Sequence, residues 1–242
     1  MRSENISDKK VRAGASARYR RPYFVVKRVC DFMLAAILLI PAMAVIGLCC
    51  VAIKMETNAP VFYIQERPGL KGKIFRIIKL RTMIMQTERD GRQLTDMERM
   101  TRTGRIIRML SMDELPQIFN ILRGEMSFIG PRPLHVNYLL RYNDEQMRRH
   151  DVLPGISGWA QVNGLNAISW EKKFELDVWY VDHVCAMLDI RIFLLTIKSM
   201  VIRQGINAGT QDTMEEFIGS EFDPDTGLEE ALPHVSEERK RS

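Results

Sequence analysis

The longest apolar run in the chain extends from Phe32 to Ile53, 22 residues without a charged side chain. About 20 apolar helical residues cross the core of a bilayer, and 22 residues of α-helix extend about 33 Å. The run starts too far from the N-terminus and is too long for a cleaved signal peptide. Its length and lack of polar positions favour a membrane helix over a buried core helix.

Both flanks of this run are basic, which makes its orientation ambiguous. Residues 1–28 contain nine basic residues (Lys or Arg) and two acidic ones, and residues 54–81 contain seven basic residues and two acidic ones. A single pass would export one basic flank, against the positive-inside rule. Pro41 removes one backbone hydrogen bond and offers a place to bend. The pattern therefore favours a helix that enters, bends and returns, while an ordinary pass with a tolerated proline stays open.

The rest of the pattern predicts an α+β protein that is mostly helical. Two β-rich stretches, 61–65 and 74–80, flank a Gly- and Pro-containing turn and predict a small β-hairpin. Residues 86–102 are expected to form a loop or an exposed helix, and 154–164 a loop. Helices are expected at 103–110, 114–122, 134–149, 169–184 and 189–204, with Ser111 and Glu114 as a capping box and with Ser169 and Asp189 as caps.

The two helices expected near the C-terminus are amphipathic, so they either pack in the core or lie in the membrane interface. Charge adds domain boundaries to this picture. The net charge of +5 combines a body of 32 bases and 20 acids (residues 1–209) with a tail of three bases and ten acids. The expected organisation is a basic flexible arm at 1–24, a re-entrant membrane helix at 25–58, a folded domain at 59–209 and an acidic tail at 210–242.

The sequence lacks the common phosphate-loop, dinucleotide, zinc-protease and serine-hydrolase motifs. The candidate chemistry lies instead at Asp113 and Glu114, at the start of a predicted helix. A helix start favours an ionised carboxylate and attracts phosphate, so Asp113 could attack phosphorus and Glu114 could help to hold Mg²⁺. Simple helix capping is the structural alternative.

Basic residues elsewhere fit an anionic substrate. Lys79 and Arg81 end the second hairpin strand, and Arg132 stands between two prolines. A proline-restrained arginine loses less freedom when it binds a phosphate, and its guanidinium suits bidentate contact. Each of these residues on its own could also be an ordinary solvated cation.

Taken together, the motifs resemble the bacterial sugar transferase family, the monotopic phosphoglycosyl transferases that begin glycan assembly on polyprenyl phosphate. The resemblance covers roughly residues 25–205, and the small, stand-alone branch typified by the bacillosamine phosphate transferase is the most similar. The matching stretches are KRVCDFMLAAILL (27–39), PVFYIQERPGLKGKIFRIIKLRTM (60–83), RMLSMDELPQIFNILRGEMSFIGPRPL (108–134), LPGISGWAQVNG (153–164) and WEKKFELDVWYV (170–181).

This resemblance implies that a UDP-sugar and polyprenyl phosphate react, with Mg²⁺, to give polyprenyl-diphospho-sugar and UMP. It implies that Asp113 is the nucleophile and forms a covalent phosphosugar intermediate, that Glu114 assists the metal site, and that Arg108 and Arg132 support phosphate binding. It also implies a re-entrant helix with both ends in the cytoplasm, at the bacterial inner membrane, and that 59–209 is a cytoplasmic catalytic domain. Family members often have Ser-Pro near the middle of this helix, whereas here Pro41 follows Ile40, so the position of the bend can differ.

A rival interpretation is a membrane-anchored scaffold that binds lipid headgroups and performs no catalysis. The expected partners are the UDP-sugar, polyprenyl phosphate and inner-membrane lipids. Nucleic acid is not expected, because no recognition motif accompanies the basic charge. The branch resemblance favours an N-acetylated amino sugar as the donor, with hexose 1-phosphate transfer left open, and the oligomeric state is not readable from the sequence.

Overall fold

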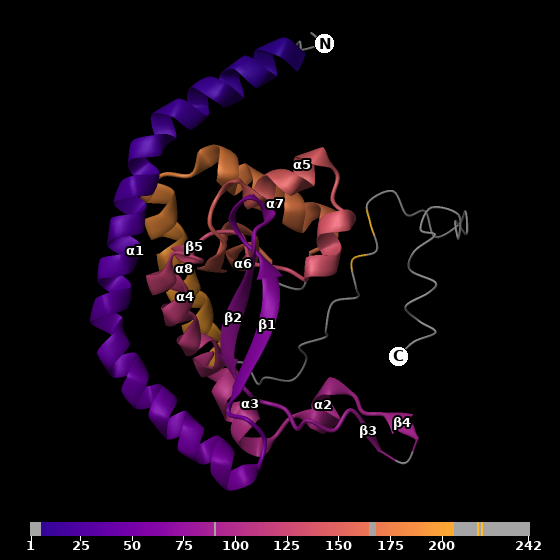
Figure 1. Cartoon of the computed structure of the whole chain (residues 1–242). Coiled ribbons are helices and arrows are strands. Elements are labelled where there is room, and N and C mark those ends of the chain that lie inside the picture. Colours follow the sequence, from indigo (N-terminus) through magenta and orange to yellow (C-terminus); the bar gives the residue numbers. More distant parts are fainter. Residues whose placement is uncertain (1–5, 90, 165–167, 206–216, 218, 220–242) are drawn as a thin grey trace.

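The computed structural model describes residues 6–89, 91–164, 168–205, 217 and 219; for residues 6–21 and 201–205 it describes the backbone only. Among these residues helices dominate, and the strands form three small two-stranded sheets. This architecture confirms the predicted α+β class with mostly helical content. Figure 1 shows one long helix curving around a body that contains the remaining elements.

Helix α1 (Ile6–Glu56) is continuous through Pro22 and Pro41. Figure 1 shows a smooth arc, so the sharp bend predicted at Pro41 is not seen. Long helices commonly curve gently around a core, and membrane helices tolerate an interior proline. The helix also includes most of the stretch predicted as a flexible arm. Lys, Arg and Ala in that stretch are good helix formers, and extending an existing helix is easier than starting one.

The segment from Pro22 to Glu56 is apolar enough to cross a membrane, with a mean hydropathy of 2.8 over its most apolar window, of which only 22% is buried. One face packs on the body through small or β-branched residues such as Ala35, Ala42 and Ile46. The opposite face leaves large apolar side chains exposed, so the helix is not an ordinary core helix. These side chains include Val25, Val29, Phe32, Met33, Ile37, Ile40, Met43, Leu48, Val51 and Met55.

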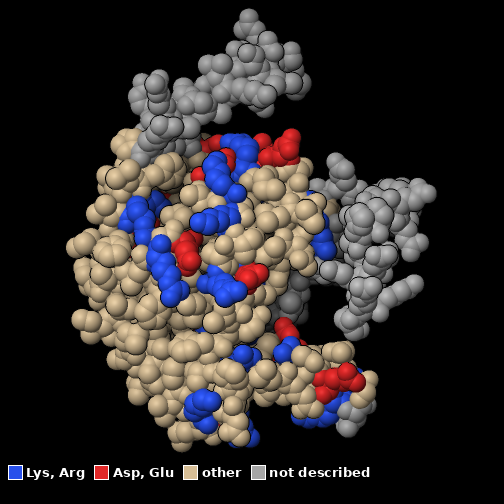
Figure 2. All heavy atoms as spheres, in the orientation of Figure 1, with Lys and Arg blue, Asp and Glu red and all other residues tan. Residues whose placement is uncertain are grey.

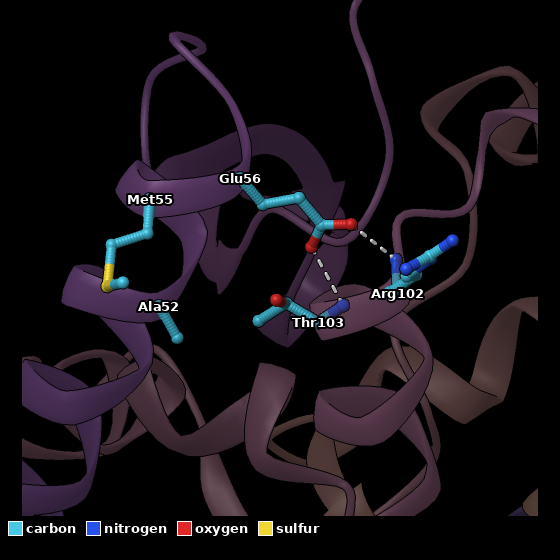
Figure 3. Close-up of a pocket in the computed structure, with 5 residues that line it drawn as sticks. All are labelled: Ala52, Met55, Glu56, Arg102 and Thr103. Carbon is cyan, nitrogen blue, oxygen red and sulfur yellow. Dashed lines mark hydrogen bonds between the residues drawn. The ribbon is translucent and has the colours of Figure 1, made fainter.

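Both ends of this apolar segment are fixed to the body by polar contacts. Near its start, Lys27 Nζ lies 2.6 Å from Asp189 Oδ2. At its end, the Glu56 carboxylate accepts hydrogen bonds from the backbone N–H groups of Arg102 (2.7 Å) and Thr103 (2.8 Å), beside an open cavity of about 570 Å³ (Figure 3). A carboxylate at a helix N-terminus satisfies free N–H groups and the helix dipole. The body therefore holds the apolar segment of α1 near both of its ends.

The predicted hairpin is confirmed as β1 (Phe62–Pro68) and β2 (Ile74–Leu80), an antiparallel pair in which Tyr63 faces Lys79. A short 3₁₀ turn, η1 (Leu70–Gly72), joins the two strands. Asn120, which is fully buried, accepts a hydrogen bond from the Ile78 N–H and donates one to the Arg76 carbonyl. The outer edge of β2 is thereby bound to the element that follows the Asp113–Glu114 pair.

The region around this pair differs in detail from the prediction. Helix α3 (Arg102–Met109) is capped by Thr101, whose hydroxyl accepts from the Gly104 N–H at 2.8 Å. The expected helix at 114–122 is a 3₁₀ helix, η2 (Met112–Gln117), followed by α4 (Ile118–Arg123). The predicted capping box is wrong, because Ser111 is left-handed (φ 55°) and forms no side-chain cap.

Three further predictions need correction. Within 86–102, the short exposed helix α2 (Asp96–Arg99) agrees with one of the two expectations, but the two-strand ribbon of β3 (Glu88–Arg89) and β4 (Arg92–Gln93) was not expected. The helix expected at 134–149 is divided into η3 (Val136–Leu140), α5 (Asp144–Met147) and η4 (Arg148–Asp151), because Asn143 caps a new helix. The loop expected at 154–164 contains β6 (Gly155–Ser157), which pairs in parallel with β5 (Ser127–Ile129), and α6 (Trp159–Val162).

The last two helices are close to expectation. Helix α7 (Trp170–His183) is capped by Ser169 as predicted, with the serine hydroxyl 3.3 Å from the Lys172 N–H. Helix α8 (Ala186–Gly205) begins earlier than predicted, so Asp189 lies inside its first turn and is not its cap. The Asp189 carboxylate instead accepts hydrogen bonds from Lys27 and from the Tyr180 hydroxyl. The acidic tail lies outside the described residues apart from Phe217 and Gly219.

Candidate active site

The site is built around Glu114, which receives two cations from distant parts of the chain. Lys79, at the end of β2, lies 2.8 Å from Glu114 Oε1, and Arg132, after β5, lies 2.5 Å from the same oxygen. Glu114 is largely buried, and burial opposes its ionisation. The charges and hydrogen bonds of Arg132 and Lys79 nevertheless lower the pKa of Glu114 to about 2. The structure therefore brings together three of the residues singled out in the sequence.

Asp113 precedes Glu114 in η2 but has a different environment. Within the described residues it forms no hydrogen bond or ion pair, and its side chain is half-buried. Burial, followed by the charge of Glu114, raises its pKa, while Lys79, Arg108 and Arg132 oppose this rise. One carboxylate of the pair is thus engaged by cations, and the other is unengaged and more basic. That asymmetry suits a nucleophile beside an electrostatic partner.

Arg108 reaches this site from the last turn of α3. Its Nε donates to the Thr82 hydroxyl at 2.9 Å, and Thr82 is buried just after β2. Helix α3 can lie this close because residue 104 is glycine: a Cβ there would be 2.0 Å from the Thr82 carbonyl oxygen. Gly104 therefore sets the distance between α3 and the end of β2.

Arg81 does not join the cluster, although the sequence made it a candidate. Its Nε donates to the Pro60 carbonyl at 2.7 Å, and its guanidinium lies 5.8 Å from the centre of the Tyr63 ring. These contacts fasten the start of β1 to the end of β2. Side chains two positions apart on a strand share a face, but Arg81 lies just beyond the end of β2 at Leu80, and its guanidinium is taken up by the Pro60 carbonyl.

The sequence reading missed a buried ion pair that supports Arg132. Arg149 and Asp177 are each 2% exposed, and Arg149 Nη2 lies 2.6 Å from Asp177 Oδ2. The same guanidinium donates to the Arg132 carbonyl at 2.8 Å. The available signal was Asp177 itself, a charged residue beside the apolar positions Phe174 and Val178 of α7. A charge on a buried helix face needs a partner.

The glycines of the 154–164 region serve backbone packing. A Cβ on Gly155 or Gly158 would lie 2.1 or 2.2 Å from backbone atoms of Gly130. This close approach fixes the chain immediately before Pro131 and Arg132. The expected role of this segment, an approach of its backbone to a nucleotide, stays a prediction.

The residues present fit Mg²⁺ only in part. Among the described residues, no three His, Cys, Asp or Glu side chains cluster as a metal site. Mg²⁺ in phosphate-transfer sites is commonly held by one or two carboxylates, with water and substrate phosphates as the other ligands. Asp113 and Glu114 can supply those carboxylates, although Glu114 would have to share its oxygens with Lys79 and Arg132.

On the face that carries the β1–β2 hairpin, basic and acidic side chains are interspersed between uncharged areas, and the rim formed by α1 is largely uncharged (Figure 2). The large exposed side chains of the α1 rim, such as Ile37, Ile40 and Leu48, are apolar. The site of three cations and two carboxylates thus lies in a body with an apolar rim.

Comparison with known proteins identifies the fold family. The family model described as "Bacterial sugar transferase" matches residues 22–203. The chain belongs to the bacterial sugar transferase family. This match spans the apolar part of α1, the hairpin, the Asp113–Glu114 pair and most of α8, and it confirms the resemblance seen in the sequence motifs.

Individual relatives of this bacterial sugar transferase differ in length. It is 48% identical to "Uncharacterized sugar transferase EpsL" of Bacillus subtilis over 196 residues, covering 81% of this chain and 97% of the relative. It is 41% identical to the UDP-N-acetylgalactosamine-undecaprenyl-phosphate N-acetylgalactosaminephosphotransferase of Aeromonas hydrophila, and the match covers 74% of this chain and 44% of that protein. It is 37% identical to the UDP-glucose:undecaprenyl-phosphate glucose-1-phosphate transferase of Escherichia coli, and the match covers 72% of this chain and 39% of that protein. The chain thus spans less than half of the latter two proteins and nearly all of the small one.

Proposed function

We propose that this bacterial sugar transferase moves a sugar 1-phosphate from a UDP-sugar to undecaprenyl phosphate, giving undecaprenyl-diphospho-sugar and UMP and so initiating a glycoconjugate. The observation that carries the proposal is the unlike pair of carboxylates. Asp113 is unengaged, while Glu114 is held by Lys79 and Arg132. The names of the Aeromonas and Escherichia relatives, which include undecaprenyl phosphate, support the acceptor.

Asp113 is the proposed nucleophile. Its carboxylate oxygen attacks the phosphorus that bears the sugar, the bond from that phosphorus to the bridging oxygen breaks, and UMP leaves with the bonding electrons. An oxygen of undecaprenyl phosphate then attacks the same phosphorus and restores the Asp113 carboxylate. Neither step needs an external oxidant or a net proton transfer. The raised pKa of Asp113, caused first by burial, favours this role because a more basic carboxylate is a better nucleophile.

Arg132 and Arg108 are proposed to bind the diphosphate. The guanidinium of Arg132 is already oriented by its contact with Glu114 and by its position between Pro131 and Pro133, and Arg suits bidentate phosphate contact. Mg²⁺ held by Asp113 and Glu114 would neutralise charge that develops on the phosphate oxygens. Lys79 keeps Glu114 ionised and adds positive charge to the site.

The membrane arrangement proposed is monotopic, on the cytoplasmic face of the inner membrane. Lys27 and Glu56 both contact the same folded body, through Asp189 and through the start of α3. A body on one side of a bilayer cannot hold both ends of a helix that crosses it. The exposed apolar face of α1, and the exposed Met187, Ile190, Phe193 and Leu194 of α8, would then lie in the lipid.

The donor is proposed to carry an N-acetylated amino sugar. The support is the resemblance of the sequence motifs to the bacillosamine-type branch; identity is 41% to the Aeromonas relative, against 40% and 37% to the glucose-1-phosphate transferases of Xanthomonas campestris and Escherichia coli. Purified protein with undecaprenyl phosphate and Mg²⁺ should release UMP from one UDP-sugar of a panel that includes UDP-N-acetylgalactosamine, UDP-N-acetylglucosamine and UDP-glucose. A preference for UDP-glucose would contradict the sugar assignment alone. Release from none of a broad panel would favour the non-catalytic scaffold.

A further inference from the structure

The chain beyond α8 contacts the folded body at Phe217, a residue of the acidic tail. Its side chain is 2% exposed and lies in an aromatic pocket. The centroid of the Phe217 ring lies 4.9 to 5.9 Å from the ring centroids of four aromatic residues. We define the aromatic pocket by the residues that form it, Tyr138, Tyr142, Trp170 and Phe174.

The backbone of Phe217 is held as well as its ring. Its N–H donates to the Tyr138 hydroxyl at 3.2 Å, and its carbonyl oxygen accepts a hydrogen bond from the Arg141 guanidinium. A residue that is fixed by a buried ring and by both backbone groups occupies a built site. A loose apolar contact would leave its N–H and carbonyl to water.

The pocket and its occupant come from different parts of the chain. All four pocket residues lie within the family match, which ends at residue 203, and Phe217 lies beyond it. The tail that carries Phe217 has ten acidic and three basic residues at 210–242, whereas residues 1–209 carry a net charge of +12. Attraction between these opposite charges favours docking of the tail on its own body.

The pocket is connected to the candidate active site through Arg149. Tyr142 and Phe174, which contact Phe217, are also the rings beside the Arg149 guanidinium, at 5.8 and 5.7 Å. Arg149 donates to the Arg132 carbonyl at 2.8 Å. Removal of Phe217 would leave both rings free to repack, and the buried guanidinium depends on them for part of its stabilisation.

We propose that Phe217 anchors the acidic tail in the aromatic pocket and acts as a positioning residue for Arg132 through Arg149. The kinetic part of this inference rests on the proposed function, while the docking part does not. Because small displacements of a phosphate-binding group reduce the rate strongly, we expect kcat/KM of Phe217→Ala to fall about tenfold.

Two further variants of the full chain control this experiment. Phe222→Ala makes the same change elsewhere in the acidic tail and should keep wild-type kcat/KM. Phe217→Leu keeps most of the apolar volume and should recover most of the loss. Equal losses in Phe217→Ala and Phe222→Ala would overturn the anchor, because the effect would then belong to the tail in general.

A double-mutant cycle separates positioning from mere stabilisation. In an Arg132→Lys background, Phe217→Ala should lower kcat/KM less than threefold, because residues that act through one another are not additive. A full tenfold loss in that background would show that Phe217 does not act through Arg132. Circular dichroism establishes that each variant is folded.

Hydrogen exchange tests docking without reference to activity. The Phe217 amide should be protected in the wild type, and Tyr138→Phe, which removes its acceptor, should increase its exchange. An unprotected Phe217 amide in the wild type would overturn the proposal even if Phe217→Ala fails to fold. Protection in a wild-type protein that transfers no sugar phosphate would instead contradict the proposed function and leave the docking supported.

Discussion

Gly104 offers a sharp test of how α3 positions the active site. Substitution by alanine normally stabilises a helix interior by about 0.5–1 kcal/mol. Here the added Cβ would lie 2.0 Å from the Thr82 carbonyl oxygen, where contacts below 3.0 Å essentially do not occur. The obstacle is backbone rather than a flexible side chain, so α3 has to move by about 1 Å.

That movement has two expected consequences. Overpacking costs about 1–3 kcal/mol, and subtracting the gain in helix propensity of about 0.5–1 kcal/mol leaves a net loss of up to about 2.5 kcal/mol. The displacement also separates Arg108 from Thr82, now 2.9 Å apart, and it shifts the start of η2. A misplacement of about 1 Å lowers activity by roughly a hundredfold.

The assay compares two identical substitutions in two helices. Gly47 lies in α1, and apart from the backbone of its own helix no atom lies within 4 Å of its added Cβ, so Gly47→Ala should be neutral or stabilising. Thermal unfolding in detergent measures stability, and UMP release measures activity. Wild-type stability and rate in Gly104→Ala, or equal losses in both variants, would refute the steric reasoning.

Three other predictions follow from single contacts. Arg149→Ala leaves the buried Asp177 carboxylate unpaired and should lower the free energy of unfolding, measured in urea, by about 3–5 kcal/mol. The control is Lys172→Ala, which removes an exposed ion pair and should change the free energy of unfolding by less than about 1 kcal/mol. The pKa of Glu114 is lowered from 4.5 to about 2, so its ionised form stabilises the folded state above about pH 4.5, and this stabilisation is lost as the pH falls towards 2. Glu114→Gln should therefore flatten the pH dependence of stability in this window, and an unchanged slope would contradict the assignment. Ser111 has φ 55°, so Ser111→Val should destabilise the protein by about 1–2 kcal/mol relative to Ser111→Gly in the same unfolding assay.

Local signals in the sequence predicted much of the fold. The uncharged run predicted the apolar part of α1, β-branched residues around a turn predicted β1 and β2, and Ser169 predicted the start of α7. Each of these signals acts within a few residues. The failures lie where a distant partner changes a local preference. Glu114, expected to complete a capping box, binds Lys79 and Arg132, and Asp189, expected to cap α8, binds Lys27.

The candidate site shows the same division. Asp113, Glu114, Lys79 and Arg132 were identifiable as charged residues at element boundaries, but their distances depend on tertiary packing. No local sequence pattern indicated the role of Gly104 or the parallel pairing of β5 with β6. Both depend on the close approach of two backbone segments that are distant in the sequence. The anchor at Phe217 was equally hidden, since a single aromatic residue in an acidic tail does not reveal its pocket.

The central claim is that Asp113 carries the sugar phosphate between two half-reactions. Purified protein should be mixed with a UDP-sugar labelled in the phosphate next to the sugar, in the absence of undecaprenyl phosphate. Mass spectrometry should locate the labelled phosphosugar on the peptide that contains Asp113, UMP should appear in equal amount, and addition of undecaprenyl phosphate should remove the label. Absence of label from wild-type protein that turns over, or turnover by Asp113→Asn at the wild-type rate, would contradict the account.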